Sequence, residues 1–252
     1  ERRDFTINAM AYNDNRGLVD EFGGIKDLKD GIIRCVGDAG QRFDEDALRM
    51  LRAVRFAGQL GFAIEEKTRE AIVERADHLK NISAERIRVE LTKLLVSKEA
   101  GRIRDAYKTG MTKYFLPELD AAMQTEQKNP HHIYTVGEHS ICGIELMNCF
   151  FGITSDEKIY DKIPENVLET AKKLAAKMDK KQQTVLCMTM LLHDIAKPAV
   201  MTVDEKGIGH FIGHPAQSEK MAKKIMRRLT FDNDSISKAC RLIRFHDYRM
   251  ED

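Results

Sequence analysis

The second half of the chain holds four short segments that carry histidine or the dipeptide His-Asp, separated by helix-length stretches. In chain order they contain His139, His193-Asp194, His214 and His246-Asp247. Imidazole nitrogens and carboxylate oxygens are ligand types that hold divalent metal ions. Ligands for one ion often come from separate helices of a bundle, and this spacing fits such an origin. The sequence therefore predicts a metal site built from these segments.

The alternative for each histidine is an ordinary structural role, since a buried histidine is more often a hydrogen-bonded core residue than a ligand. The remaining four histidines (His78, His131, His132 and His210) have no such neighbours and are expected on the surface or in loops. The alternative for the whole set is a helical domain that keeps the fold but binds no metal.

A second set of candidate residues lies in the first half of the chain, where charged side chains recur every three residues. These are Asp46, Arg49, Arg52 and Arg55. On a helix this spacing keeps them on one side. Arginine offers a planar fork of donors for phosphate and carbonyl oxygens, so the stripe could bind a nucleotide. The plainer alternative is a solvated helix face with an Asp46–Arg49 ion pair.

Composition limits the class of protein. The chain has 252 residues, of which 41 are basic and 40 acidic, so its net charge is +1. Such a length fits one large domain or two to three small ones. With balanced charge, nucleic-acid contact must come from a local patch. The sequence has no apolar run long enough for a membrane span. Its five cysteines form no CxxC pair, which is typical of reduced thiols in a cytoplasmic protein.

The elements that would position both sets are mainly helices. Strand character is confined to residues 1–37, where two short apolar runs flank the expected turn GGIKDLKDG at 23–31. Helices are expected from about 44 to 96, with one ending at Gly61 and another beginning after Ser83 as N-cap. EQKNP at 126–130 is the expected linker. Further helices are expected at 132–150, 165–178, 182–196, 214–229 and 234–247.

Three motifs in the first half also carry a family resemblance. They are RRDFTINAMAY (2–12), GLVDEFGGIKDLKDGIIR (17–34) and EDALRMLRAVRFAGQLGF (45–62). In this order they resemble the later head and neck motifs of the bacterial tRNA nucleotidyltransferase and poly(A) polymerase family, which includes the CCA-adding enzymes. The resemblance runs to about residue 120. It implies a mainly α chain, with the C-terminal part of an α/β nucleotidyltransferase head at 1–40 and a helical neck and body at 41–125.

The resemblance also assigns roles to residues. It implies that Arg3, beside Asp4, contacts the incoming nucleotide, and that Asp46 and Arg49 serve as a protein template for the bases of CTP and ATP. Arg52 and Arg55 match arginines that the family places against the nucleotide, and Glu45 matches the acidic residue before the template aspartate. An Asp/Arg pair presents acceptors and donors to the edge of a base, so it can select C or A without a nucleic-acid template.

The catalytic centre of that family is a glycine-containing phosphate loop followed by a D-x-D pair that carries two Mg²⁺ ions. Neither motif occurs in this sequence. We therefore expect the chain to be a fragment whose catalytic portion lies upstream of Glu1, and to transfer no nucleotide by itself.

The four His/Asp segments resemble the HD-domain phosphohydrolases over about residues 130–252. The minimal ligand set implied is His139, His193, Asp194 and Asp247. His214 and His246 match positions that other HD proteins use for a second metal or a substrate phosphate, and Lys197 could neutralise a phosphate. The metal implied is Mg²⁺, Mn²⁺ or Ni²⁺, and the reaction is hydrolysis of a phosphomonoester or a 2′,3′-cyclic phosphate.

Three functions remain open from the sequence. The first is a tRNA nucleotidyltransferase that adds CMP and AMP to tRNA 3′ ends, with tRNA, ATP and CTP as partners. The second is a stand-alone HD phosphohydrolase, and the third is an inactive RNA-binding fragment. Two basic patches could contact RNA phosphates. One spans Lys172–Lys181, and the other comprises Lys220, Lys223, Lys224, Arg227 and Arg228.

Overall fold

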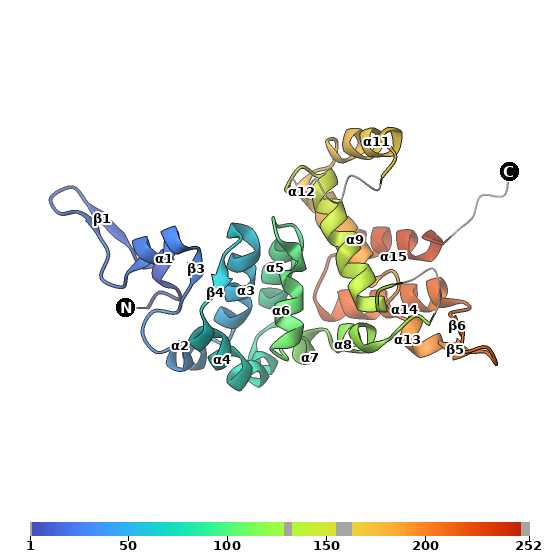
Figure 1. Cartoon of the computed structure of the whole chain (residues 1–252), viewed down its shortest axis with the longest axis horizontal. Coiled ribbons are helices and arrows are strands. Elements are labelled where there is room, and N and C mark those ends of the chain that lie inside the picture. The colour runs from blue at the N-terminus through green and yellow to red at the C-terminus, as the bar shows by residue number, and fades with distance from the viewer. Residues whose placement is uncertain (1, 129–132, 155–162, 248–252) are drawn as a thin grey trace. The chain divides into compact units, whose positions relative to one another are not determined.

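The computed structural model describes residues 2–128, 133–154 and 163–247, and its chain divides into two compact units (Figure 1). Unit 1 comprises Glu1–Phe115 and unit 2 comprises Leu116–Asp252. Helices predominate and the strands are two or three residues long, which confirms the predicted mainly α fold. The finer division at residues 40 and 125–130 stays a prediction. His131 and His132 lie outside the described residues.

Unit 1 combines short strands with helices. The strands are β1 (Ala11–Asn13), β2 (Gly17–Val19), β3 (Ile32–Ile33) and β4 (Ala63–Ile64). The α-helices are α1 (Gly24–Asp30), α2 (Ala39–Glu45), α3 (Leu48–Leu60), α4 (Glu66–Arg75), α5 (Ala84–Leu95), α6 (Ile103–Lys108) and α7 (Thr112–Phe115). The 3₁₀ turns are η1 (Thr6–Asn8), η2 (Ala76–Asn81) and η3 (Ala100–Arg102).

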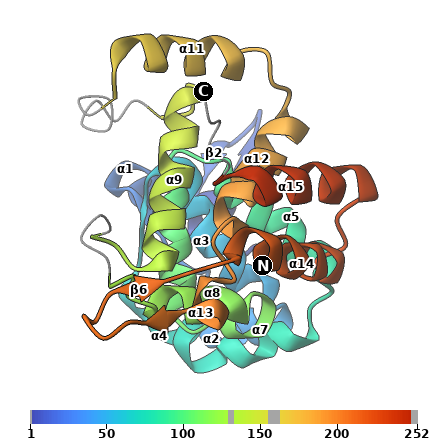
Figure 2. The ribbon, with the colours of Figure 1, turned by 90° about the vertical axis from the view of Figure 1, so that its right-hand side faces the viewer.

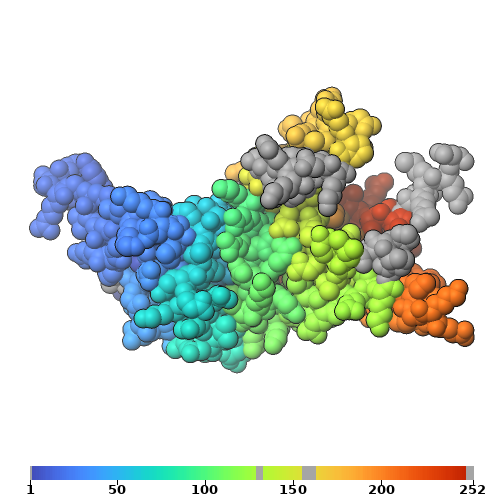
Figure 3. All heavy atoms as spheres, in the orientation of Figure 1, coloured from blue at the N-terminus to red at the C-terminus, as the bar shows by residue number. Residues whose placement is uncertain are grey.

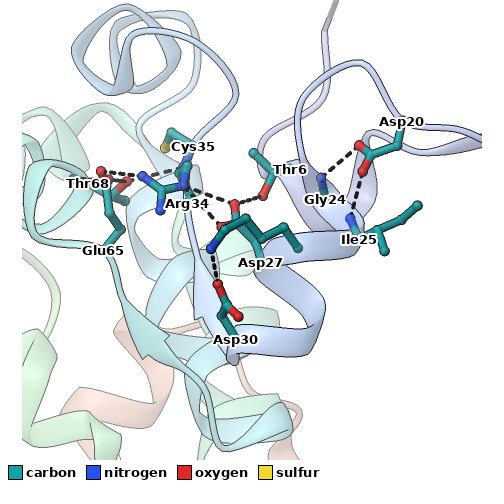
Figure 4. Close-up of polar contacts among 11 residues, drawn as sticks. Thr6, Asp20, Gly24, Ile25, Asp27, Asp30, Arg34, Cys35, Glu65 and Thr68 are labelled. Carbon is teal, nitrogen blue, oxygen red and sulfur yellow. Dashed lines mark hydrogen bonds and ion pairs between the residues drawn. The ribbon is translucent and has the colours of Figure 1, made fainter.

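The expected turn at residues 23–31 is wrong, because this segment forms helix α1. Asp20 accepts hydrogen bonds from the backbone N–H groups of Gly24 (2.7 Å) and Ile25 (2.8 Å), and so caps the helix start (Figure 4). Gly31, with φ of 69°, ends the helix in the left-handed region. The strands on either side of α1 therefore do not pair with each other. Strand β2 pairs antiparallel with β1, and β3 pairs in parallel with β4, which follows helix α3.

The β1–β2 hairpin projects from the rest of unit 1 (Figures 1 and 3). Tyr12 and Leu18 on this hairpin are exposed.

Helix α3 is the centre of unit 1. Its buried face includes the predicted stripe Leu48, Leu51 and Val54, and it packs against α5. Gly61, with φ of 72°, ends the helix as expected from the sequence. Ser83 occupies the N-cap position of α5, also as expected, although its side chain makes no capping bond.

A chain of polar contacts ties the head remnant to α4 (Figure 4). The Thr6 hydroxyl donates to Asp27 (2.7 Å), and Arg34 bridges Asp27 (3.0 Å) and Glu65 (2.8 Å). Glu65 also accepts from the hydroxyl of Thr68 (2.7 Å), which accepts in turn from the Cys35 N–H (3.2 Å). The contacts join residues from 6 to 68, so the head remnant is fixed to the helices that follow it.

In the residues that the structure describes, unit 2 is helical apart from one short hairpin. Its helices are α8 (Pro117–Gln124), α9 (Val136–Phe150), α11 (Glu165–Ala175), α12 (Lys180–Leu192), α13 (Lys197–Val200), α14 (His214–Arg228) and α15 (Asn233–Phe245). The hairpin pairs β5 (Thr202–Val203) with β6 (Gly209–His210). The five helices expected after the linker are therefore present, with boundaries shifted by a few residues.

Side-chain caps fix the starts of three helices that carry the candidate metal ligands. Thr135 caps α9, Asp179 forms a capping box with Gln182 on α12, and Asp232 caps α15. Helices α14 and α15 lie side by side (Figure 2). No helix in the described ranges is both long enough and apolar enough to cross a membrane.

Candidate nucleotide and metal sites

The four residues of the charged stripe do not share one helix. Asp46 is the C-cap of α2, while Arg49, Arg52 and Arg55 lie on α3. The predicted Asp46–Arg49 pair is replaced by two others. Asp46 pairs with Arg86 from α5 (2.7 Å), and Arg49 pairs with Glu45 (2.6 Å).

Arg49 also connects the neck motif to the head motif. Its guanidinium donates to the backbone carbonyl of Arg2 (2.9 Å) and to that of Arg42 (3.0 Å). Arg2 and the exposed Arg3 are adjacent in the chain. The two motifs that the sequence assigns to the nucleotide thus meet in space.

Arg52 lies between two buried carboxylates. It donates to Asp4 through Nε (2.7 Å) and lies 3.8 Å from Glu90 through Nη1. Burial raises the pKa of Asp4, but hydrogen bonds from Asn8 and Arg52 outweigh this effect, so the pKa of Asp4 falls below its ordinary value. Asp4 is therefore an ionised partner of Arg52 at neutral pH.

Arg55 is buried, and its guanidinium serves the interior of unit 1. It donates to Glu90 (2.8 Å) and to Gln59 (2.7 Å), and its guanidinium lies 3.6 Å from the centre of the Phe56 ring. The residue is 7% exposed. A direct nucleotide contact by Arg55 stays a prediction, while its contacts here are those of a core ion pair.

Glu90 was not among the predicted site residues, although the sequence holds a signal for it. Glu90 falls within the apolar stripe Ile87, Leu91 and Leu94 at helical spacing, where a carboxylate must find a buried partner. Arg86 was not predicted either, and exposed arginines give no comparable signal.

A cleft of about 500 Å³ lies beside the template residues. Asp46 and Arg86 line it, together with Glu45, His78 and Asn81. The Asp46–Arg86 pair is half-exposed, with 29% and 50% of the two side chains accessible. Breaking this exposed ion pair costs little free energy, so either side chain can leave its partner and bind a ligand.

In unit 2, four histidines converge on one buried carboxylate, that of Asp194. The Nε2 atoms of His139 and His193 lie 3.8 and 3.2 Å from Oδ2, and those of His214 and His246 lie 3.2 and 3.4 Å from Oδ1. Two groups with metal-ligand geometry result, His139–His193–Asp194 and Asp194–His214–His246. We call these five residues the His/Asp cluster. Five of the six predicted ligands are thus brought together.

The tautomers of three of these histidines follow from their outer contacts. The Nδ1 atoms of His193, His214 and His246 lie 2.8, 2.9 and 2.7 Å from the backbone carbonyls of Met190, Phe211 and Ile243. A carbonyl only accepts, so each Nδ1 carries the proton, and Nε2 of a neutral ring presents a lone pair. These lone pairs face the acceptor oxygens of Asp194.

Such an arrangement needs a cation. The Nε2 atoms of His214 and His246 lie 3.2 Å apart, and the buried Oδ1 of Asp194 accepts no hydrogen bond within the described part of the chain. The donor set of nitrogen and carboxylate oxygen fits a divalent transition metal or Mn²⁺ better than a proton alone.

Lys197 and Gln127 complete the wall of the cluster. The buried ammonium of Lys197 donates to Asp194 Oδ2 (2.7 Å) and to Gln127 Oε1 (2.9 Å). Gln127 is 2% exposed, and a Cβ on Gly209 would lie 2.5 Å from its carbonyl oxygen. Gln127 is therefore packed inside unit 2, whereas Glu126 and Lys128 are exposed, and residues 129–130 of the predicted linker lie outside the described residues. Nothing in EQKNP alone signals this.

Asp247 stands apart from the cluster. It is exposed and belongs to neither group of converging ligand atoms among the described residues. The residues of the His/Asp cluster line a cleft of about 470 Å³. Asp247 lines this cleft as well, as do Phe211 and Ile212. His210 lines this cleft too and pairs with Asp204 (2.9 Å), while His78 lies in unit 1.

Three family models match the chain in order. The poly(A) polymerase head domain matches residues 1–34, the probable RNA- and SrmB-binding site of polymerase A matches 61–123, and the HD domain matches 164–252. The resemblance to the poly(A) polymerase family and to HD domains, predicted from the motifs, is confirmed. The HD match includes every cluster residue except His139.

The chain is similar in sequence to bacterial CCA-adding enzymes. That of Leuconostoc mesenteroides is 48% identical over 117 residues, which cover 46% of this chain and 29% of the relative. That of Bacillus licheniformis is 50% identical over 121 residues, covering 48% and 30%. The match thus spans less than a third of the length of these relatives.

Solved structures support the fold. A tRNA-processing enzyme in an apo form is similar over 97% of this chain and 52% of its own, with a TM-score of 0.59 and 20% identity. A tRNA nucleotidyltransferase complexed with a primer tRNA and an ATP analogue is similar over 76% and 48%, with a TM-score of 0.54 and 24% identity. At these identities the similarity shows the fold alone.

Proposed function

We propose that the chain is part of a tRNA nucleotidyltransferase that adds CMP and AMP to tRNA 3′ ends, and that unit 1 selects the nucleotide. The observation that carries this proposal is the bond from Arg49 to the carbonyl of Arg2, which brings the neck template beside Arg3. The names of the CCA-adding relatives support the substrate class. The partners we propose are tRNA, ATP and CTP. The transfer step belongs to the whole protein and its Mg²⁺ ions.

The template residues suit cytosine and adenine. Both bases carry an exocyclic amine where uracil and guanine carry a carbonyl. The Asp46 carboxylate can accept from that amine when it leaves Arg86, and Arg49 can donate to a ring nitrogen or carbonyl. Arg52, held by Asp4, keeps a positive charge beside the site for the phosphates.

The test is equilibrium binding of CTP, ATP, GTP and UTP to this chain. We expect CTP and ATP to bind more tightly, and Asp46→Ala to remove about 1–3 kcal/mol of that discrimination. Arg49→Ala should have a similar effect. The matched control is Asp105→Ala, which removes an aspartate of α6 that pairs with Arg102. This variant should leave nucleotide binding unchanged. Equal affinity of the wild-type chain for all four nucleotides would exclude the proposal.

We propose a second function for unit 2, a metal-dependent phosphohydrolase acting on phosphomonoesters or 2′,3′-cyclic phosphates. The supporting observation is the convergence of Nε2 lone pairs on Asp194. The His/Asp cluster would hold the metal, and Asp247 would be a further ligand from the cleft wall. A bound divalent metal lowers the pKa of water so that hydroxide is available at neutral pH. Lys197 places its ammonium at the site, where it can neutralise phosphate.

This function is tested on 2′,3′-cyclic AMP with metal-stripped chain given Mg²⁺, Mn²⁺ or Ni²⁺. We expect turnover with at least one metal, lost in both His193→Ala and Asp194→Ala. His78→Ala, which changes a histidine of unit 1, is the control and should retain full turnover. Absence of turnover with every metal would leave the HD domain an architectural role.

A further inference from the structure

Of the two basic patches seen in the sequence, the structure pairs two lysines of one with carboxylates, while four residues of the other form no ion pair among the described residues. In the patch at Lys172–Lys181, Lys173 pairs with Glu169 (3.3 Å), and Lys181 pairs with both Asp232 (3.0 Å) and Asp234 (3.3 Å). These carboxylates cancel much of the local field.

The second patch has a different environment. Its residues Lys220, Lys223, Lys224 and Arg227 recur at helical spacing on α14, and all four are exposed. We call them the α14 basic stripe. None of them forms an ion pair with any residue in the described ranges, whereas the neighbouring Arg228 pairs with Glu118 (2.7 Å). The stripe is therefore a run of four positive charges, and Glu219, the one carboxylate on α14, pairs with Arg244 of α15 (3.9 Å).

The position of the stripe relates it to the His/Asp cluster. His214, a cluster residue, is the first residue of α14, and the buried face of the helix lies opposite the stripe. At 1.5 Å per residue, the stripe begins about 9 Å along the helix from His214 and ends about 20 Å along it. Arg241 on the adjacent α15 is exposed as well, and His246 is the C-cap of that helix. The stripe thus runs along α14 away from the end at which His214 lies.

The chemistry favours a strand of phosphates as the partner. Regularly spaced cations match the repeating charge of a nucleic-acid backbone. A membrane surface would need apolar side chains among the cations, and α14 carries no exposed large apolar residue. We propose that the α14 basic stripe binds the backbone phosphates of a single-stranded RNA whose 3′-terminal phosphate lies at the His/Asp cluster. This inference rests on the proposed hydrolytic function of unit 2.

The proposal predicts a length-dependent and salt-dependent effect. The probes are a decaribonucleotide and a diribonucleotide, each with a 3′-terminal phosphate, titrated by fluorescence anisotropy over a range of salt concentrations. The variant Lys220→Glu/Lys224→Glu/Arg227→Glu removes three contacts. The slope of log affinity against log salt should then fall by about 2 for the decanucleotide, at about 0.7 per phosphate. The dinucleotide, too short to reach beyond the cluster, should keep its slope.

The matched control is Lys173→Glu/Lys177→Glu/Lys180→Glu, which makes the same change in net charge on α11, on α12 and in the segment between them. It should retain the wild-type slope. Circular dichroism verifies that both variants are folded. Equal slopes for wild type and stripe variant would overturn the proposal, as would equal losses in the two variants. Loss of binding to anionic lipid vesicles with unchanged RNA binding would also overturn it.

The outcome separates this proposal from the functions on which it is built. If 2′,3′-cyclic AMP is hydrolysed while the stripe variant binds the decanucleotide like wild type, only the RNA path is wrong. If the slope falls as expected and no metal supports turnover, the RNA surface stands and the hydrolytic function fails.

Discussion

The two candidate sites solve the problem of buried charge in opposite ways. In unit 1 each arginine of the stripe has a carboxylate partner, since Arg49 pairs with Glu45, Arg52 with Asp4 and Arg55 with Glu90. In unit 2 the one carboxylate of the cluster faces lone pairs on at least three imidazoles, and Lys197 is its only ammonium partner among the described residues. In the first site every arginine of the stripe is paired with a carboxylate before any ligand binds. In the second site the converging ligand atoms need a bound cation.

The difference predicts how each site responds to loss of a component. A site with internal ion pairs depends on its own residues, and a missing partner leaves an uncompensated buried charge. A site with converging lone pairs depends on what it binds, so its stability follows the concentration of that ligand.

The largest effect is expected for Glu90→Ala. The side chains of Arg55 and Glu90 are 8% and 5% exposed, so this variant leaves a buried guanidinium without its partner. The free energy of unfolding of unit 1 should fall by about 3–5 kcal/mol. Native-state hydrogen exchange of α3 and α5 amides measures it without assuming that both units unfold together.

Glu66→Ala is the control, because Glu66 pairs with Arg69 on the surface and both are well exposed. It should change the exchange rates little. A loss below about 1 kcal/mol in Glu90→Ala would show that water reaches Arg55 and that the pair is not a buried one.

The second effect concerns metal and unit 2. A divalent metal at 100 times its dissociation constant should stabilise this unit by about 2.7 kcal/mol. Exchange of α12, α14 and α15 amides should slow accordingly, and a chelator should reverse the change. Unit 1 amides should not respond, because its charges are already paired. His193→Ala removes one ligand and should abolish the effect. Equal slowing in both units would contradict the contrast between the sites.

The sequence predicted the members of both sites better than their contacts. Short motifs pointed to Asp46, Arg49 and the His/Asp cluster, because residue types and their order along the chain can be read directly from the sequence. The contacts between distant residues are not written there. Spacing alone favoured an Asp46–Arg49 pair, whereas the start of α3 at Leu48 separates these residues and gives Asp46 to Arg86.

The same limit explains one structural error, at residues 23–31, and one contact that was not expected, at Gln127. Residues 23–31 read as a turn because they hold three glycines, yet Asp20 supplies the cap that lets α1 form. EQKNP reads as a linker because it is polar, yet the buried Lys197 requires an acceptor and finds it in Gln127, 70 residues earlier in the chain. In both segments a partner outside the local window decides the structure.

The smallest of the three effects is expected for Asp4→Asn, and it carries a pH signature. The pKa of Asp4 is lowered in the folded state, so ionised Asp4 stabilises unit 1 above the unfolded-state value of about 3.9, and this contribution is lost as pH falls through the folded-state pKa. At pH 7 the variant should lose about 1.5–3 kcal/mol, the usual range for a hydrogen bond to a charged group. The difference between wild type and variant should shrink below about pH 4 as the wild-type carboxyl is protonated. Hydrogen exchange of α3 amides at pH 7 measures the loss at neutral pH, and circular dichroism of acid unfolding measures the difference at low pH.

The control is Asp30→Asn, which changes an exposed pair with Lys26 and should show no such convergence. A wild-type advantage that persists undiminished to the lowest pH would mean that Arg52 is held by Glu90 alone, and that the head motif is not anchored to the neck through Asp4.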